Sequence, residues 1–166
     1  MKEIVLVDEN DKEVGVGEKL EVHKLALLHR AFSILVFNSK GELMLQQRAI
    51  KKYHCGGLSS NTCCGHPRPK ESVLSAAKRR LMEEMGFECP LQEVKTFIYN
   101  VKFDNGLTEH EFLHVFKGNF DGFPKVNPDE ADFWKWIGLK ELKEDIKQNP
   151  DKYTYWFKLI LDRLGS

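Results

Sequence analysis

The feature that most constrains this chain is a long loop that leads directly into an amphipathic helix, in the stretch 61–87 (NTCCGHPRPKESVLSAAKRRLMEEMGF). Helical spacing gives its second half one apolar stripe, formed by Val73, Leu74, Ala77, Leu81 and Met85. Gly86 suits the left-handed position after a last helical turn, so the helix is expected to begin near Glu71 or Ser72 and to end at Gly86. The loop before it spans 51–69, and loops of this length inside compact domains are usually functional.

Hydrophobic patterning elsewhere indicates a domain of mixed α and β structure. Apolar runs bounded by turn residues predict strands over 4–7, 31–37, 43–47, 94–103, 111–116 and 134–137. Helical periodicity predicts closing helices over 139–148 and 153–164, and 23–28 is expected to be an irregular or helical connection. The predicted fold class is α+β, with a mixed β-sheet sandwiched between α-helices.

Length and charge limit the possible roles. At 166 residues the chain fits one domain over 1–166, long enough for a sizeable core. The formal net charge is zero, which gives no support for nucleic-acid or membrane partners, so any phosphate must be held by a local cluster of cations. No apolar run reaches the roughly 18 residues of a membrane span, and the N-terminus lacks a signal-peptide pattern. A cytoplasmic protein is therefore expected.

The chain has four cysteines, which are Cys55, Cys63, Cys64 and Cys89. A chain of this length does not need disulfides, and no two of the four form a Cys-x-x-Cys pair, so a structural zinc site has little support. Cys64 differs from the others because Gly65 and His66 follow it in the loop. A thiol and an imidazole placed together in a long loop suggest an enzyme site.

Histidines and paired glutamates are the candidates for a metal site. Glu109 and Glu111 are two apart at the entry to a predicted strand, so both carboxylates face the same side. Close carboxylates repel unless a cation joins them, although two such residues alone favour an exposed strand end. With His23, His29 and His66 they could form a nitrogen–oxygen site that suits manganese, zinc or magnesium. The histidines without an assigned role are His54, His110 and His114.

The charged residues of the predicted helix allow two interpretations. Arg79–Glu83 and Arg80–Glu84 have i, i+4 spacing and could be surface ion pairs worth about 0.5 kcal/mol or less each. Alternatively, Glu84 could hold Mg²⁺, which prefers a few carboxylates together with substrate phosphates. A diphosphate would need several basic residues. The candidates near the loop are Lys19, Arg48, Lys52 and Arg80, whereas Lys51 is typical of ordinary surface charge.

The stretch 65–87 resembles the Nudix signature, Gly-x5-Glu-x7-Arg-Glu-U-x-Glu-Glu-x-Gly-U, in which U is aliphatic. The residues that match the pattern are Gly65, Glu71, Arg79, Leu81, Glu83, Glu84 and Gly86. Phe87 replaces the final aliphatic residue, and Arg80 stands where the pattern has a glutamate. In Nudix hydrolases that glutamate belongs to the acidic set that assembles the catalytic metals. A cation there disfavours metal binding and argues against pyrophosphate hydrolysis.

Further segments resemble one branch of this superfamily, the type I isopentenyl-diphosphate isomerases. These segments are 61–67 (NTCCGHP), 29–33 (HRAFS), 48–52 (RAIKK) and 108–111 (TEHE). The resemblance extends from Lys19 to Trp156, which is most of the chain. It implies a Nudix-like fold and isomerisation of isopentenyl diphosphate to dimethylallyl diphosphate. That reaction adds a proton at one carbon and removes one at another, on opposite faces of the hydrocarbon.

The resemblance also implies roles for individual residues. Cys64 and Glu111 match the catalytic pair, and Tyr99 matches a tyrosine hydrogen-bonded to Glu111; the hypothesis is that Glu111 delivers the proton and Cys64 removes one as a thiolate. The ligands implied for one divalent metal, Mn²⁺ or Mg²⁺ with Zn²⁺ less natural, are His23, His29, His66, Glu109 and Glu111. Glu84 and the backbone carbonyl of Cys64 match the site of Mg²⁺ on the substrate diphosphate. The implied substrate-binding residues are Lys19, Arg48, Lys52, Arg80 and, at the carbon end, Trp156.

Two positions depart from the family pattern without removing a catalytic group. Ser59 stands where several relatives carry a tryptophan, and Tyr155 where a proline often precedes the tryptophan. There are two alternative functions. A Nudix hydrolase of a nucleoside diphosphate derivative requires a glutamate at position 80, and a non-enzymatic metal-binding or nucleotide-binding module leaves Cys64 and Tyr99 without a role. The isomerase is preferred, and a monomer and a weak dimer both remain open.

Overall fold

Nine strands and four α-helices lie in the described part of a computed structural model, residues 2–52 and 55–164. The strands are β1 (Glu3–Val7), β2 (Glu13–Glu18), β3 (His29–Phe37), β4 (Leu43–Arg48), β5 (Ser59–Ser60), β6 (Cys63–Gly65), β7 (Leu91–Lys102), β8 (Thr108–Asn119) and β9 (Ala131–Ile137). The helices are α1 (Lys19–Lys24), α2 (Val73–Met85), α3 (Leu139–Gln148), the 3₁₀ turn η1 (Pro150–Lys152) and α4 (Tyr155–Leu164). His54 lies outside the described residues, and the single domain over 1–166 stays a prediction.

Most predicted elements are confirmed, and the differences concern short segments. The predicted strands and both closing helices are present, and α1 accounts for part of the expected connection. The sequence did not predict β2, whose EVGVGE sequence contains two glycines that weaken strand propensity; pairing with β1 makes it a strand. β5 and β6 fall inside the segment expected to be a loop, and each is a strand only because it pairs with a longer one.

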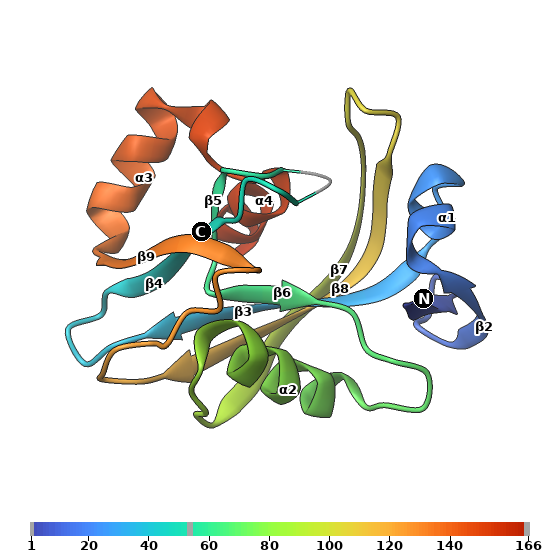
Figure 1. The fold of residues 1–166 in the computed structure, drawn as a ribbon, viewed down its shortest axis with the longest axis horizontal. Coiled ribbons are helices and arrows are strands. Elements are labelled where there is room, and N and C mark those ends of the chain that lie inside the picture. The colour runs from blue at the N-terminus through green and yellow to red at the C-terminus, as the bar shows by residue number, and fades with distance from the viewer. Residues whose placement is uncertain (1, 53–54, 165–166) are drawn as a thin grey trace.

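The central strand of the mixed sheet is β3 (Figure 1). It pairs in parallel with β8, and this register sets His29 beside Glu111. β3 also pairs antiparallel with β6, and in this pairing Ser33 lies opposite Cys64. β8 continues the sheet to β7, whereas β4 continues it to β5 and β9. The strand pairing therefore brings residues from the loop, from β3 and from β8 to one region.

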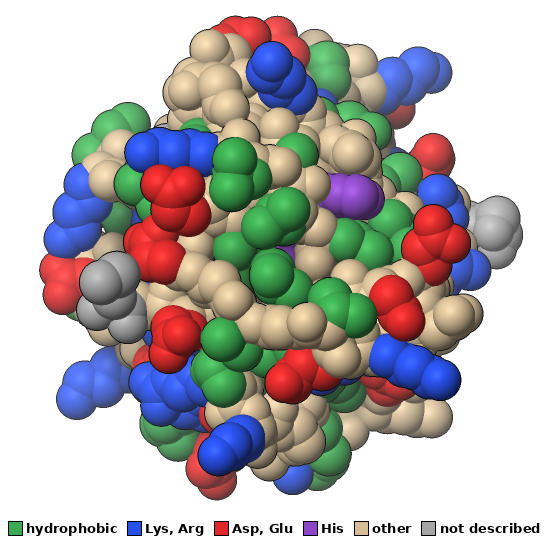
Figure 2. All heavy atoms as spheres, turned by 90° about the vertical axis from the view of Figure 1, so that its right-hand side faces the viewer, with side chains coloured by type: hydrophobic (Ala, Val, Ile, Leu, Met, Phe, Trp, Pro, Cys, Tyr) green, Lys and Arg blue, Asp and Glu red, His purple; other side chains and the backbone are tan. Residues whose placement is uncertain are grey.

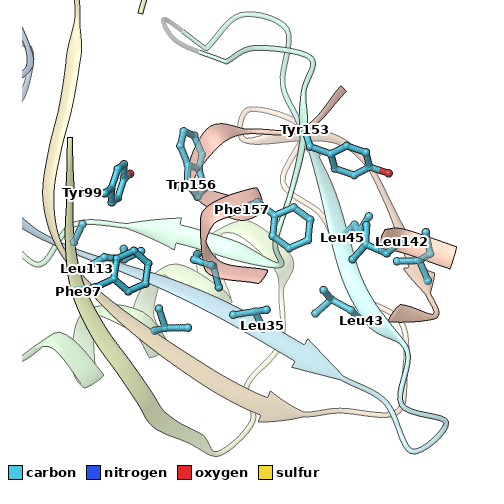
Figure 3. Close-up of a cluster of buried hydrophobic side chains, with 14 residues drawn as sticks. Leu35, Leu43, Leu45, Phe97, Tyr99, Leu113, Leu142, Tyr153, Trp156 and Phe157 are labelled. Carbon is cyan, nitrogen blue, oxygen red and sulfur yellow. The ribbon is translucent and has the colours of Figure 1, made fainter. Parts of the chain in front are cut away.

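Two hydrophobic cores lie on opposite faces of this sheet. One contains buried side chains of α3 and α4, such as Leu142 and Phe157, packed on Leu35 and Leu113 of the sheet (Figure 3). The other packs α2 against the opposite face and includes Phe32, Ile34, Leu81 and Met85. Helices thus cover both faces, as Figure 1 shows, which confirms the predicted sandwich.

α2 has the predicted ends but a slightly different buried face. The hydroxyl of Ser72 accepts a hydrogen bond from the backbone N–H of Ser75, and Gly86 adopts a left-handed φ of 72° after the last turn. The prediction that Leu74 belongs to the apolar stripe is wrong, because 40% of this side chain is exposed. The buried residues of α2 begin at Ala76, so Leu74 lies in the exposed start of the helix although it shares a face with Leu81, seven residues later.

The molecular face formed by α1, β2 and the β7–β8 hairpin carries hydrophobic side chains at its centre, surrounded by acidic and basic groups (Figure 2). Val14 and Val16 of β2 and Leu25 after α1 are among the exposed hydrophobic residues of the protein. None of the helices within the described residues has both the length and the apolar character that crossing a membrane requires.

Candidate active site

A cavity of about 400 Å³ contains most of the residues that the sequence singles out. The predicted site residues that line it are Lys19, Arg48, Lys52, Cys64, His66, Arg80, Glu84, Glu109, Glu111 and Trp156. Three further predicted residues, His23, His29 and Tyr99, are buried and contact residues of this lining. The structure therefore brings together the whole predicted set.

Three histidines and one glutamate form a compact group beside the cavity. Ligand atoms of His23, His29, His66 and Glu111 all lie within 4.8 Å of one another. Glu109, the fifth predicted ligand, lies next to this group and contacts Nε2 of His23. The prediction of an exposed strand end, which rested on the two glutamates alone, is wrong, because Glu109 is 3% and Glu111 5% exposed. Pairing of β8 with β3 and β7 buries this end of the strand.

Backbone carbonyls orient two of the imidazoles. Nδ1 of His23 lies 2.7 Å from the carbonyl oxygen of Lys19, and Nδ1 of His29 lies 2.9 Å from that of Leu27. Because a carbonyl only accepts, each Nδ1 carries the proton and each Nε2 lone pair faces the group. Nε2 of His29 is buried and has no hydrogen-bond partner among the described residues. A buried lone pair aimed at other donor atoms is the arrangement that a metal ligand requires.

Burial and charge set the protonation of this group. Burial lowers the pKa of His23 and lowers that of His66 to about 3, so both imidazoles are neutral and able to ligate. Burial also raises the pKa of Glu109 well above its usual range, and the nearby Glu111 carboxylate adds to this effect. For Glu111, its contacts with the His29 and His66 imidazoles outweigh burial and hold its pKa well below the usual range. Neutral imidazoles beside a carboxylate are compatible with a divalent metal.

The predicted catalytic residues lie on both sides of the central strand. The hydroxyl of Tyr99 donates a hydrogen bond of 2.7 Å to Oε1 of Glu111, because the two residues are paired between β7 and β8. On the other side, the indole N–H of Trp156 donates to Sγ of Cys64 at 3.1 Å. Ser33 of β3 also lies beside this sulfur, at 3.4 Å from Oγ to Sγ. Burial raises the pKa of Cys64 and raises that of Tyr99 well above its usual range.

Basic residues form the other part of the lining. A guanidinium nitrogen of Arg80 lies 2.5 Å from Oε2 of Glu84 and 3.2 Å from Glu130, which Lys52 also contacts. Burial opposes the charge of Arg80, but Glu84 and its other acidic neighbours raise its pKa above the usual value. Burial lowers the pKa of Lys19 to about 8. Arg48 lies with its guanidinium carbon 5.2 Å from the Trp156 ring centre.

The two alternatives for the helix charges are resolved differently for the two arginines. Glu84 is only 5% exposed, so the surface-pair interpretation of Arg80–Glu84 is wrong. Arg79 makes a weaker contact with Glu83, at 3.2 Å, than with Glu71, whose two carboxylate oxygens it binds at 2.8 and 2.9 Å. The i, i+4 spacing did not reveal this bidentate contact, because Glu71 lies in the loop before the helix.

Several residues near the site were not found from the sequence. Nε2 of Gln46 donates to Oε1 of Glu84 at 2.9 Å, and Glu130 joins Lys52 and Arg80. No motif or spacing in the sequence indicates Gln46 or Glu130, because their positions depend on the pairing of β4 with β9 and on the contact between β4 and α2. Asn61, between β5 and β6, lies against Cys64.

The remaining predicted positions lie outside the cavity lining. Ser59 pairs with Gln47 in the sheet and does not line the cavity. The ring of Tyr155 lies 6.2 Å from that of Tyr99, centre to centre. Lys51 forms an exposed ion pair with Asp129, in agreement with its prediction as surface charge.

Comparison with known proteins identifies the family. The chain matches the NUDIX domain model over residues 27–157. It is 54% identical over 164 residues to isopentenyl-diphosphate Delta-isomerase 2 of Aromatoleum aromaticum, an alignment that covers 99% of this chain and 87% of that relative. The chain belongs to the isopentenyl-diphosphate Delta-isomerase family. A second member of this family, from Burkholderia multivorans, is 51% identical over 98% of this chain and 92% of its own length.

Solved structures confirm the fold on which this family is built. The crystal structure of DR0079 from Deinococcus radiodurans superposes with a TM-score of 0.74 at 20% identity, over 89% of this chain and 90% of the other. The MutT protein of Methanosarcina mazei superposes with a TM-score of 0.67 at 19% identity, over 82% of this chain and 91% of the other. At these identities the likeness shows the fold alone, and it agrees with the predicted Nudix-like α+β architecture.

Proposed function

We propose that this protein isomerises isopentenyl diphosphate to dimethylallyl diphosphate. The observation that carries the proposal is that Cys64 and Glu111 line one cavity in a chain of the isomerase family. The reaction adds one proton to the terminal alkene carbon. It removes one proton from the CH₂ group that is bonded to the other, methyl-bearing alkene carbon. One proton donor and one proton acceptor therefore suffice, and no electrons are transferred.

The diphosphate end of the substrate meets the basic part of the cavity. Lys19, Arg48, Lys52 and Arg80 line it, and several cations at one place can offset the charge of a diphosphate. Glu84, with the backbone carbonyl of Cys64, would hold Mg²⁺ on the diphosphate, a role that suits a buried carboxylate fixed by Gln46. Binding of the diphosphate then orients the hydrocarbon.

The hydrocarbon end meets the catalytic pair. Protonation of an unactivated alkene needs a positioned acid in a site that excludes water. Tyr99 holds Glu111 in place by its hydrogen bond, and Trp156 holds Cys64. The indole of Trp156 can also stabilise a tertiary carbocation through its ring quadrupole, by roughly 2 kcal/mol in a desolvated site. His23, His29, His66, Glu109 and Glu111 would hold one divalent metal, Mn²⁺, Mg²⁺ or Zn²⁺, which supplies positive charge beside the buried carboxylates.

Incubation of the purified protein with isopentenyl diphosphate and Mg²⁺ in deuterated water tests the proposal. Deuterium should appear in dimethylallyl diphosphate, because the added proton comes from a solvent-exchanged group. Release of phosphate from this substrate or from nucleoside diphosphate derivatives would favour the hydrolase instead, and metal binding without turnover would favour the binding module. A cytoplasmic location, the absence of nucleic-acid or membrane partners, and a monomer or weak dimer stay predictions.

A further inference from the structure

The side chain of Asn61 has only one possible amide orientation. It is completely buried, and its Nδ2 lies 3.0 Å from the carbonyl oxygen of Ile34 and 2.9 Å from that of Cys63. Both partners only accept hydrogen bonds, so the NH₂ group must face them. The reversed orientation would set the amide oxygen against two carbonyl oxygens without any donor. Oδ1 of Asn61 therefore points in the opposite direction.

The Oδ1 atom of Asn61 faces the predicted catalytic cysteine. It lies 3.2 Å from Sγ of Cys64 and accepts a hydrogen bond from the hydroxyl of Ser60 at 2.9 Å. An amide oxygen cannot donate, so the hydrogen between Asn61 and Cys64 is the thiol hydrogen. On its other side the sulfur accepts from the indole N–H of Trp156. A Cys64 thiolate would lie against Oδ1 with no hydrogen between the two acceptors. The geometry therefore favours the thiol form of Cys64 over the thiolate expected from the sequence.

One network of hydrogen bonds connects the segments that carry Asn61 and Trp156, two of the partners of the sulfur. The Ser60 hydroxyl lies 3.0 Å from that of Thr154, and the backbone N–H of Thr154 donates to the carbonyl of Ser59. Thr154 is two residues before Trp156, so β5, which immediately precedes Asn61, and the start of α4 are joined next to the cysteine. Ser60, Asn61 and Thr154 are each at most 1% exposed, which keeps water from competing for these bonds.

We propose that Asn61 is a positioning residue for the isomerisation. Its carbonyl accepts the thiol hydrogen of Cys64 and, together with Trp156, holds the sulfur in one rotamer at the cavity wall. This inference rests on the proposed function, because it assumes that Cys64 acts on the substrate. Asn61 does not line the cavity, so it acts through Cys64.

Steady-state kinetics of Asn61→Ala test the effect on turnover. The variant should lose at least about tenfold in kcat, because the reacting atom is no longer oriented, and KM should stay within about twofold. Thr62→Val is the matched control. Thr62 is also fully buried and joins the same segment between β5 and β6 to Met44 and Val36 through its hydroxyl, whereas the hydrogen-bond partners of the Cys64 sulfur are Ser33, Asn61 and Trp156. Its kcat should stay within about twofold despite a comparable loss of stability.

The S–H stretching band of Cys64 tests the contact without any turnover. Subtraction of the Cys64→Ala infrared spectrum from that of the wild type isolates the band, which a hydrogen bond shifts to lower frequency. Asn61→Ala should move the band to higher frequency, and Thr62→Val should leave it in place. If the wild type failed to isomerise isopentenyl diphosphate, the proposed function would be lost, while this band would still decide whether Asn61 accepts the thiol hydrogen of Cys64.

Two outcomes would overturn the proposal. One is a folded Asn61→Ala protein whose band and kcat match the wild type. The other concerns Ser60→Ala, a variant that retains Asn61 and can be measured even if Asn61→Ala does not fold. In Ser60→Ala, Oδ1 accepts only from Cys64, so the band should move to lower frequency; a band that does not move would contradict the assigned contact.

Discussion

Arg80 shows how one residue can distinguish two chemistries on one fold. It stands where the Nudix pattern has a glutamate, and its guanidinium lies 2.7 Å from Glu83 and 2.5 Å from Glu84. A cation therefore stands among these carboxylates, at the position where the pattern would place another one. It also lines the cavity, where it can face a bound diphosphate. The substitution is consistent with an enzyme that holds the diphosphate intact.

Cys64→Ala should lower kcat by about 10²–10⁴-fold, because it removes one member of the proton-transfer pair. The fold should persist, since Cys64 is only partly buried at the cavity wall. Steady-state turnover of isopentenyl diphosphate, with circular dichroism as the folding control, measures this. Near-normal turnover in a folded variant would end the assignment of Cys64.

Glu84→Gln should raise the Mg²⁺ concentration needed for half-maximal activity. The change is nearly isosteric but removes the charge that Mg²⁺ requires, and it leaves Arg80 paired with Glu83 and Glu130 only. A Mg²⁺ titration of activity gives the measurement. Glu88→Gln, an exposed glutamate just after the helix, is the control. An unchanged titration in the Glu84 variant would count against its role.

At the scale of elements, the ends of α2 depend on local geometry. Gly86 has a φ of 72°, and a Cβ there would lie 2.6 Å from the carbonyl oxygen of Lys125. Gly86→Ala should therefore destabilise by more than the roughly 1–3 kcal/mol of left-handed strain alone. Gly41→Ala is the matched control, because Gly41 has a φ of 77° but open space around its Cβ position. Urea denaturation should give the larger loss for Gly86; equal losses would show that the clash does not matter.

The loop before α2 is joined to the helix by Glu71 and Arg79. The bidentate contact with Arg79 lowers the pKa of Glu71 below its ordinary value of 4.5. The contribution of this ion pair to the free energy of unfolding is therefore present above pH 4.5 and is lost as the pH falls through the folded-state pKa of Glu71. Glu71→Gln should lower the free energy of unfolding at pH 7 by at most about 1 kcal/mol, because the pair is partly solvated. The difference from the wild type should shrink toward pH 3. A constant difference between pH 7 and 3 would contradict this linkage.

At the scale of the whole molecule, the metal-ligand group joins α1, β3, the loop after β6 and β8. A divalent ion that binds only the folded state should raise Tm when Mn²⁺, Mg²⁺ or Zn²⁺ is added to chelator-treated protein. His66→Ala should lose most of this increase. His110→Ala should keep it, because His110 bonds the Ala26 carbonyl instead of the group. Equal increases in both variants would place the binding site elsewhere.

Local signals in the chain were sufficient for the helix ends, most strands and the family. Ser72 and Gly86 act on backbone groups within a few residues, and the motif in 61–87 lies in one continuous segment. The convergence of the site was not visible at that level. His29 meets Glu111 through the β3–β8 register, and Cys64 meets Ser33 through a three-residue strand that has no propensity of its own. The burial of Glu84, Glu109 and Glu111, which the residues alone did not favour, arises from the packing of other elements on them. Motif spacing depends on near neighbours, whereas burial and amide orientation, as at Asn61, depend on segments far apart in the chain. For this reason the sequence named the chemical groups, and the folded chain arranged them into a site.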